Sequence, residues 1–236
     1  MCGRYTLRSS PQEIAAQFEL LAPPSIGPRY NIAPSQQIGA VTAQLDTAGR
    51  AVRQWRELSW GLLPGWAENS AGTQRPINAR SETAASKPTF REAYRRRRCL
   101  IPADGYYEWQ ATGRDKQPYF FSLRDEPLFA FAGLYEHWKG ASGQSGAEAI
   151  DSCTILTTKA NEMMREFHDR MPVILESRDY EAWLDPTCED ADVVAPLCRP
   201  LPSERMQHWA VSSRVNSPKH DDAGCLRRSE VRRLFD

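Results

Sequence analysis

Closely spaced runs of β-branched and aromatic residues constrain the fold of this chain more than any other feature. They dominate Gln36–Leu58 and Cys99–Trp138, and turn-forming residues break both stretches into segments of strand length. The helical patterns between them are short and lack the regular strand–helix rhythm of a parallel sheet. The sequence therefore predicts an α+β fold: largely antiparallel β-sheets, a sandwich-like or barrel-like core, and short flanking helices.

Helix signals are clearest near the N-terminus. Ser10 is a capping residue, Pro11 suits the first helical position, and Glu13 completes a capping box. The apolar face expected of this helix consists of Ile14, Phe18 and Leu21. A later strand at Cys153–Thr158 precedes a helix at Asn161–Phe167, which delivers His168 at its end. Further helices are expected at Tyr180–Leu184 and Ser229–Phe235, and a flexible loop at Gly140–Gly146.

Length and composition indicate one globular domain spanning residues 1–236. The chain is 41% hydrophobic and 25% charged, as is usual for globular proteins. It has no signal-peptide pattern and no run of about 18 apolar residues, so a cytoplasmic protein with no membrane partner is expected. The six cysteines form no C-x-x-C unit, which predicts free thiols and no metal site.

Charge is balanced overall but segregated along the chain. Thirty basic residues match thirty acidic ones, yet residues 75–98 hold eight Lys or Arg and residues 176–192 hold seven acids. Such segregation is compatible with one phosphate-binding face. The alternative is that Arg95–Arg98 are merely solvated.

Cys2 is the most unusual chemical candidate. Removal of Met1 would leave an N-terminal cysteine, a 1,2-aminothiol. Its amine can form a Schiff base with an aldehyde, and the adjacent thiol can then close a five-membered thiazolidine. An incidental cysteine at a frayed terminus is the alternative from position alone.

Three internal segments carry polar or titratable side chains that would suit a cleft. Asn78, Arg80 and Glu82 occupy alternate positions, so an extended segment would direct all three to one side, which faces either a cleft or solvent. Glu108 lies among aromatic residues, where burial would raise its pKa toward the range useful for proton transfer, unless it lies on an exposed strand face. His168 offers a titratable imidazole, although a lone histidine is often structural.

Trp60 and Trp66 flank a loop rich in glycine and proline. Exposed, the two rings would form stacking platforms for nucleic-acid bases, and buried, they would belong to the core.

Motifs spread along nearly the whole chain resemble those of the SOS response-associated peptidase (SRAP) family. In order they read MCGRY, RYNIAP, WGLLPGW, INARSET, ADGYYEW, FHDRMP and VSSRVN, and they run from Cys2 to about Cys225. The resemblance implies a single α+β domain that binds single-stranded DNA and crosslinks to abasic sites in the DNA damage response.

The resemblance also implies roles for individual residues. The implied catalytic residues are the nucleophile Cys2, the amide Asn78, the carboxylate Glu108 and the imidazole His168. The implied DNA contacts are Arg4, Trp66 and Arg80. Ala67 stands where some members carry a second aromatic residue, which weakens the expectation of base stacking there.

The implied chemistry joins these residues in a lyase-like crosslinking reaction. Glu108 and His168 would move the protons that open the abasic sugar and expose its aldehyde. The Cys2 amine, oriented by Asn78, would then attack, and the thiol would close the thiazolidine. The expected partner is single-stranded DNA containing abasic sites, which would associate the protein with the nucleoid. No cofactor and no protein partner are predicted.

Two other functions fit the same residues. One is a cysteine peptidase, capable of self-processing, in which the Cys2 thiol attacks a peptide with help from Glu108 and His168. The other is a passive reader of single-stranded or modified DNA that uses Trp60, Trp66 and the arginines. An aldehyde trap needs the free amine, a peptidase needs only the thiol, and a reader needs neither.

Overall fold

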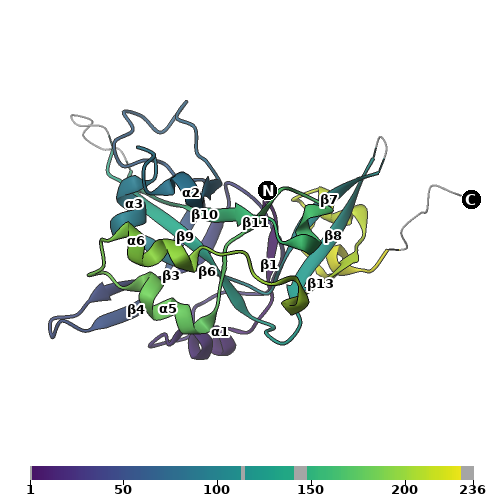
Figure 1. Cartoon of the computed structure of the whole chain (residues 1–236), viewed down its shortest axis with the longest axis horizontal. Coiled ribbons are helices and arrows are strands. Elements are labelled where there is room, and N and C mark those ends of the chain that lie inside the picture. Colours follow the sequence, from purple (N-terminus) through teal and green to yellow (C-terminus); the bar gives the residue numbers. More distant parts are fainter. Residues whose placement is uncertain (1, 113–114, 141–147, 230–236) are drawn as a thin grey trace, which may run out of the picture.

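Two β-sheets make up most of the computed structural model, which describes residues 2–112, 115–140 and 148–229 (Figure 1). In the smaller sheet the strand order is β13-β8-β7-β1-β2, and every neighbouring pair is antiparallel. Its strands are β1 (Tyr5–Leu7), β2 (Arg29–Ile32), β7 (Gly105–Thr112), β8 (Asp115–Leu123) and β13 (Met206–Ala210).

The larger sheet closes on itself, because β10 pairs with both β9 and β4 and so completes a ring with β3 and β6. Only the pairings of β10 with β4 and with β5 are parallel among the described strands. Its strands are β3 (Gln37–Leu45), β4 (Ala51–Trp60), β5 (Asn78–Arg80), β6 (Arg98–Ala103), β9 (Phe129–Trp138), β10 (Ile150–Lys159), β11 (Arg170–Pro172) and β12 (Ile174–Leu175). The expected α+β class with largely antiparallel sheets is confirmed.

The helices are short and flank the sheets (Figure 1). They are α1 (Pro11–Phe18), α2 (Ser81–Ala84), α3 (Arg91–Arg96), α4 (Glu162–Arg165), α5 (Tyr180–Leu184) and α6 (Ala191–Val194), supplemented by single 3-10 turns. The capping box of α1 is confirmed, since Ser10 and Glu13 bond each other's backbone N–H groups. Leu21 was wrongly assigned to the apolar face. Glu19 ends the helix in the left-handed region at φ 54°, and Leu21 is 90% exposed.

The other expected elements match the structure to different extents. The strand at Cys153–Thr158 is the central part of β10, and α5 has the expected bounds. The helix expected at Asn161–Phe167 is only α4, with Asn161 as its cap. Residues 141–147 and 230–236, where most of the expected loop and the last helix fall, lie outside the described residues.

Aromatic side chains join the two sheets. Phe131 of β9 contacts Tyr5 of β1 and Tyr106 of β7 at ring-centroid distances of 5.8 and 6.0 Å. Tyr5 also packs edge-on against Trp60 of β4 at 5.4 Å. All four rings are fully buried, so the core runs from one sheet into the other.

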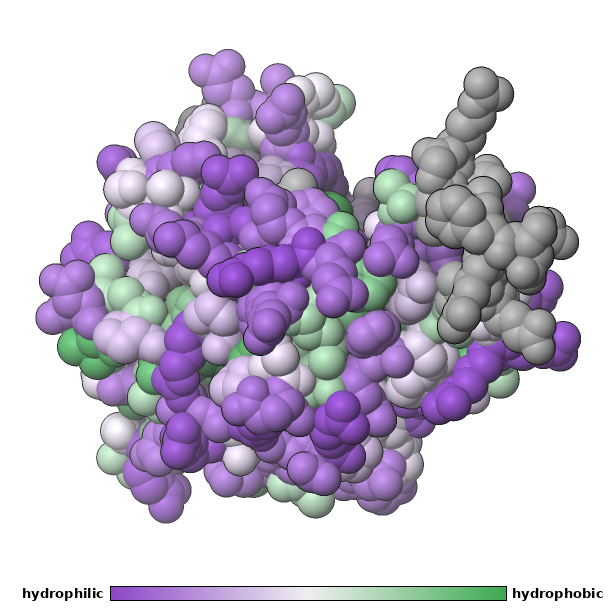
Figure 2. Space-filling model, turned by 45° about the vertical axis from the view of Figure 1, so that its right-hand side comes forward, coloured by the Kyte–Doolittle hydropathy of each residue, from purple (hydrophilic) through white to green (hydrophobic). Residues whose placement is uncertain are grey.

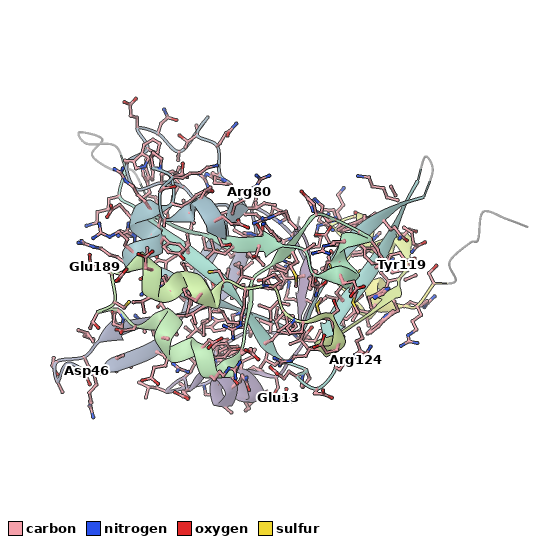
Figure 3. All side chains as sticks on the ribbon, in the orientation of Figure 1. Glu13, Asp46, Arg80, Tyr119, Arg124 and Glu189 are labelled. Atoms are coloured by element: carbon pink, nitrogen blue, oxygen red, sulfur yellow. The ribbon has the colours of Figure 1, made fainter. Side chains whose placement is uncertain are left out.

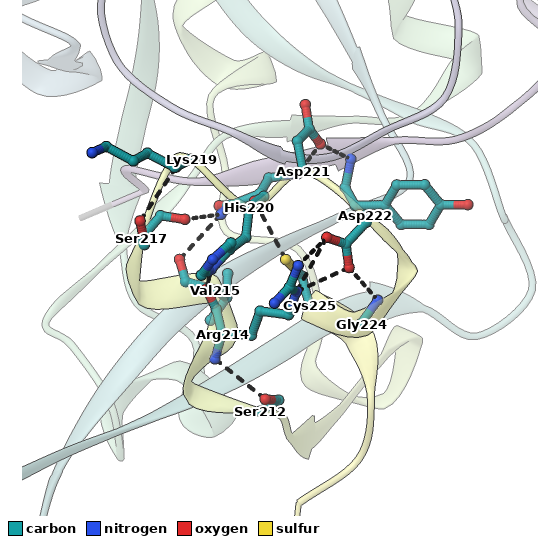
Figure 4. Close-up of polar contacts among 12 residues, drawn as sticks. Ser212, Arg214, Val215, Ser217, Lys219, His220, Asp221, Asp222, Gly224 and Cys225 are labelled. Atoms are coloured by element: carbon teal, nitrogen blue, oxygen red, sulfur yellow. Dashed lines mark hydrogen bonds and ion pairs between the residues drawn. The ribbon is translucent and has the colours of Figure 1, made fainter.

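The segment after β13 folds back against β2 (Figure 4). The amide of Asn31 donates to the carbonyls of Val215 and His220, at 3.2 and 2.7 Å. Asp221 in turn accepts the backbone N–H of Asn31 at 2.8 Å. These bonds attach the C-terminal part of the described chain to the N-terminal strands.

Candidate active site

Cys2 lies just before β1, at the junction of the two sheets. The side-chain amide of Asn78 donates to the Cys2 carbonyl at 2.9 Å, which links the N-terminal segment to β5. Asn78 is held there because β5 pairs with β10, with Asn78 opposite Ile155. The other side-chain atom of Asn78, Oδ1, is buried and accepts no hydrogen bond from the described residues. A buried acceptor therefore lies beside the N-terminal segment.

Glu108 reaches the same place from the smaller sheet. It lies on β7 two residues after Tyr106, which pairs with Tyr5, and it is only 5% exposed. Burial raises the pKa of the Cys2 thiol well above its ordinary range, and the charge of Glu108 raises it further. Burial and the nearby carboxylate therefore both favour the thiol form of Cys2.

His168 follows α4 and precedes β11. Its Nδ1 lies 2.9 Å from the backbone N of Arg170 and 2.7 Å from a carboxylate oxygen of Asp169. Nδ1 accepts from Arg170 only when it carries no proton, and it donates to Asp169 only when it carries one. When the neutral ring accepts from Arg170, its proton is on Nε2. That nitrogen is then the one that can donate a hydrogen bond.

Glu82 does not continue the polar strand face that its position suggested. The strand ends at Arg80 and α2 begins at Ser81, which turns Glu82 toward Arg170. Arg170 and Glu82 form a two-point ion pair at 2.7 and 2.8 Å, and Arg170 also donates to the carbonyl of Thr157 at 2.6 Å. Hydrogen bonding from Arg170 lowers the pKa of Glu82. The sequence did not predict this pair, although Glu82 and Arg170 both lie in family motifs.

Arg4 and Arg80 differ sharply in their surroundings. Arg4 donates to Asn31 at 2.9 Å and to the carbonyl of Val215 at 2.7 Å, and burial lowers its pKa. Arg80 is exposed, and its side chain forms no hydrogen bond or ion pair with the described residues. It projects from the upper edge of the molecule in Figure 3. Arg80 is therefore available to an anionic ligand, whereas Arg4 already has several partners.

The two tryptophans also separate. Trp66 is 65% exposed, with its indole N–H donating to the carbonyl of Pro88 at 3.2 Å. Trp60 is fully buried and donates to the carbonyl of Ile77 at 2.9 Å. The prediction that Trp60 stacks on nucleic-acid bases is therefore wrong, because its ring belongs to the core. Ala67 is buried in a small cluster with Trp138, so it adds no ring to the surface.

The basic segment ending at Arg98 is not one solvated or phosphate-binding face. Arg98 is 6% exposed, and its guanidinium donates to five backbone carbonyls. Arg95 and Arg96 both reach Glu189 at 3.1 Å, in the acidic segment. Figure 2 shows a mostly hydrophilic surface, hollowed at its upper edge between two lobes. The segregated charges thus partly neutralise each other across α3.

Two classes of site find no support in the described ranges. No group of three or more His, Cys, Asp or Glu side chains there is arranged to hold a metal ion. None of the helices in those ranges has the length and apolar character needed to cross a membrane.

Comparison with known proteins decides the family. The model of the SOS response associated peptidase (SRAP) family matches residues 1–218. The chain belongs to this family. The resemblance seen in the motifs is therefore confirmed, and it covers every residue of the candidate site.

Relatives of this chain include proteins that are named abasic site processing proteins. YoqW of Bacillus subtilis (strain 168) is 42% identical over 225 residues, which cover 94% of this chain and 96% of that protein. HMCES of Gallus gallus is 31% identical over 231 residues, covering 84% of this chain and 66% of that protein. A crystal structure of a protein from Bacteroides thetaiotaomicron has a TM-score of 0.82 at 26% identity, and covers 97% of this chain and 100% of that one.

Proposed function

We propose that this chain is an abasic-site processing protein, which binds single-stranded DNA and is crosslinked to it through Cys2 once Met1 has been removed. The observation that carries the proposal is the convergence of Cys2, Asn78 and Glu108 at the junction of the sheets. The names of the relatives, abasic site processing proteins, supply the substrate class. A DNA substrate would associate the protein with the nucleoid. We also propose that residues 1–236 act as one domain.

In the proposed reaction, the amine and the sulfur of Cys2 both bond to the aldehyde carbon of the abasic sugar. Glu108 and His168 move the protons that open the abasic sugar, and the Cys2 amine attacks the aldehyde carbon. Loss of water gives an imine. The Cys2 sulfur then bonds to the same carbon while its proton passes, through Glu108, to the imine nitrogen, which closes the thiazolidine. The buried Oδ1 of Asn78 is the acceptor we assign to the amine.

The environment of the thiol favours this reaction over the peptidase alternative. A cysteine peptidase needs a thiolate, which a neighbouring positive group stabilises by lowering the thiol pKa. Here burial and Glu108 raise the pKa of Cys2, and they outweigh the charge of the N-terminus and the backbone bond to Arg4, which lower it. No hydrogen bond joins Cys2 to His168 in the described structure. An amine that attacks first does not need the thiolate.

Denaturing electrophoresis with abasic single-stranded DNA tests the proposal. The processed wild type should form a heat-stable adduct, Cys2→Ala should form none, and Cys2→Ser should form at most a labile one. Cys188→Ala is the matched control, because Cys188 is a half-buried thiol in the acidic segment. A stable adduct in Cys2→Ala would refute the mechanism. An unchanged adduct in a protein with a permanent N-terminal extension would favour a simple thiol nucleophile.

A further inference from the structure

One face of the smaller sheet presents a set of rings around Glu108. Glu108 on β7 lies directly opposite Tyr119 on β8, so both side chains lie on one face of the sheet. On that face Phe121 pairs with Tyr106 on one side and with His208 of β13 on the other. Tyr119 is labelled on the right-hand lobe in Figure 3.

Phe167 packs against this face and immediately precedes His168. Its ring lies 4.9 Å from Tyr119, 4.9 Å from Phe121 and 5.1 Å from His208, centroid to centroid. The interplanar angles are 66°, 88° and 74°, so all three contacts are edge-to-face. One ring thus contacts two rings of β8, the strand that pairs with the strand of Glu108, and one ring of β13 beyond it.

A second contact fixes the same short segment. The backbone N–H groups of Phe167 and His168 both donate to the carbonyl of Met164, at 2.9 and 2.8 Å. The sulfur of Met164 accepts the hydroxyl of Tyr106 at 3.2 Å. A helix of only four residues is marginal by itself, so α4 depends on contacts of this kind with the sheet.

We propose that Phe167 is a positioning residue, which sets His168 relative to Glu108 by inserting its ring among Tyr119, Phe121 and His208. Phe167 itself transfers no proton and forms no bond to the substrate in this role. It fixes the placement of His168, in the segment between α4 and β11, relative to Glu108 on β7. The proposal rests on the proposed function, in which Glu108 and His168 work on the same sugar.

The test compares two substitutions of aromatic residues by leucine. Phe167→Leu removes the ring between His168 and the sheet. Trp209→Leu removes a partly buried ring from β13 that packs on the opposite face, against Phe120 at 5.1 Å. Both variants lose an aromatic contact with the smaller sheet, but only the first loses the contact beside His168.

Single-turnover crosslinking is measured across a series of abasic DNA concentrations. A displacement of about 1 Å can cost roughly 100-fold, so Phe167→Leu should lower the maximal rate by about 10- to 100-fold. Its half-saturating DNA concentration should stay at the wild-type value, and Trp209→Leu should leave both quantities unchanged. The proposal is overturned if Phe167→Leu reacts at the wild-type rate, if both variants slow equally, or if only DNA affinity falls.

A second measurement separates this proposal from the proposed function. If processed wild type forms no adduct, the proposed function fails, but the imidazole signals of His168 still report its placement in NMR spectra. Phe167→Leu should shift or broaden those signals, whereas Trp209→Leu should leave them in place. Unchanged His168 signals in Phe167→Leu would refute the positioning role.

Discussion

The larger sheet is closed and the smaller sheet is open, and the candidate site takes residues from both. The larger sheet is closed into a ring by β10, while the smaller one is open and ends at β2 and β13. The closed sheet holds Asn78 and, through β11, the segment of His168. The open sheet holds Cys2 and Glu108. The site geometry therefore depends on the contact between the sheets, which neither sheet determines alone.

The largest effect is expected from removing the ring of Phe131, which contacts both sheets. Phe131→Ala should lower the free energy of unfolding by about 3–5 kcal/mol, because a fully buried phenylalanine leaves a cavity. Urea denaturation measures the loss. Leu21→Ala, at a residue that is 90% exposed, is the control and should change it by under about 0.5 kcal/mol. A similarly small change in Phe131→Ala would mean that the sheets hold together without this ring.

The ion pair between Glu82 and Arg170 gives a smaller, pH-dependent effect within the closed sheet. Glu82→Gln should cost about 1–2 kcal/mol at neutral pH, since Arg170 is nearly buried but Glu82 is 41% exposed. The lowered pKa of Glu82 means that its stabilisation is complete above about 4.5 and is lost as the pH falls through the folded-state value. The difference in the free energy of unfolding between wild type and Glu82→Gln should therefore become smaller at acid pH. A constant difference down to low pH would exclude the ion pair as its source.

Arg80 and Arg4 are expected to differ in what their removal changes. Arg80→Ala should lower the slope of log affinity against log salt for single-stranded DNA by about 0.7 for one phosphate contact, without loss of stability. Arg4→Ala should instead lower the melting temperature, because Asn31 Oδ1 loses the donor Arg4 and the Val215 carbonyl keeps only the amide of Asn31. Fluorescence anisotropy across a salt series and thermal unfolding measure the two effects. An unchanged slope would remove Arg80 from the phosphate contacts.

His208 gives the smallest expected effect, confined to the open sheet. Burial lowers its pKa from about 6.5, so the folded state favours the neutral ring. The unfolded chain then binds more protons between the folded-state value and 6.5, and stability rises with pH across that window. His208→Phe should flatten this rise in urea denaturation curves measured at a series of pH values. A slope that persists in the variant would assign it to another group.

Local patterns in the sequence predicted local structure well. The capping box at Ser10, the bounds of α5 and the antiparallel strand pairs all follow from short-range chemistry. Closure of the larger sheet could not be predicted in this way, because it depends on β10 meeting β4 across about ninety residues of chain. The same limit explains Trp60 and Trp66, which lie in one short loop motif yet end in the core and on the surface.

The candidate site was predictable as a set of residues but not as an arrangement. The family motifs named Cys2, Asn78, Glu108 and His168. A hydrogen bond joins Cys2 to Asn78, and Glu108 acts electrostatically on Cys2. The motifs gave no sign that Arg4 is tied to the C-terminal segment, or that Phe167 contacts the sheet of Glu108. Such partners are distant in sequence, and only the fold brings them within bonding distance.

The burial of Cys2 has a consequence for how the protein matures. An aminopeptidase acts on an extended chain end that can enter its own cleft. In the folded protein Cys2 is fully buried and its carbonyl is bonded to Asn78. We therefore expect methionine excision to compete with folding, and to occur on the nascent chain before β1 joins its neighbours. On the proposed mechanism, molecules that fold with Met1 still in place would lack the free amine of Cys2.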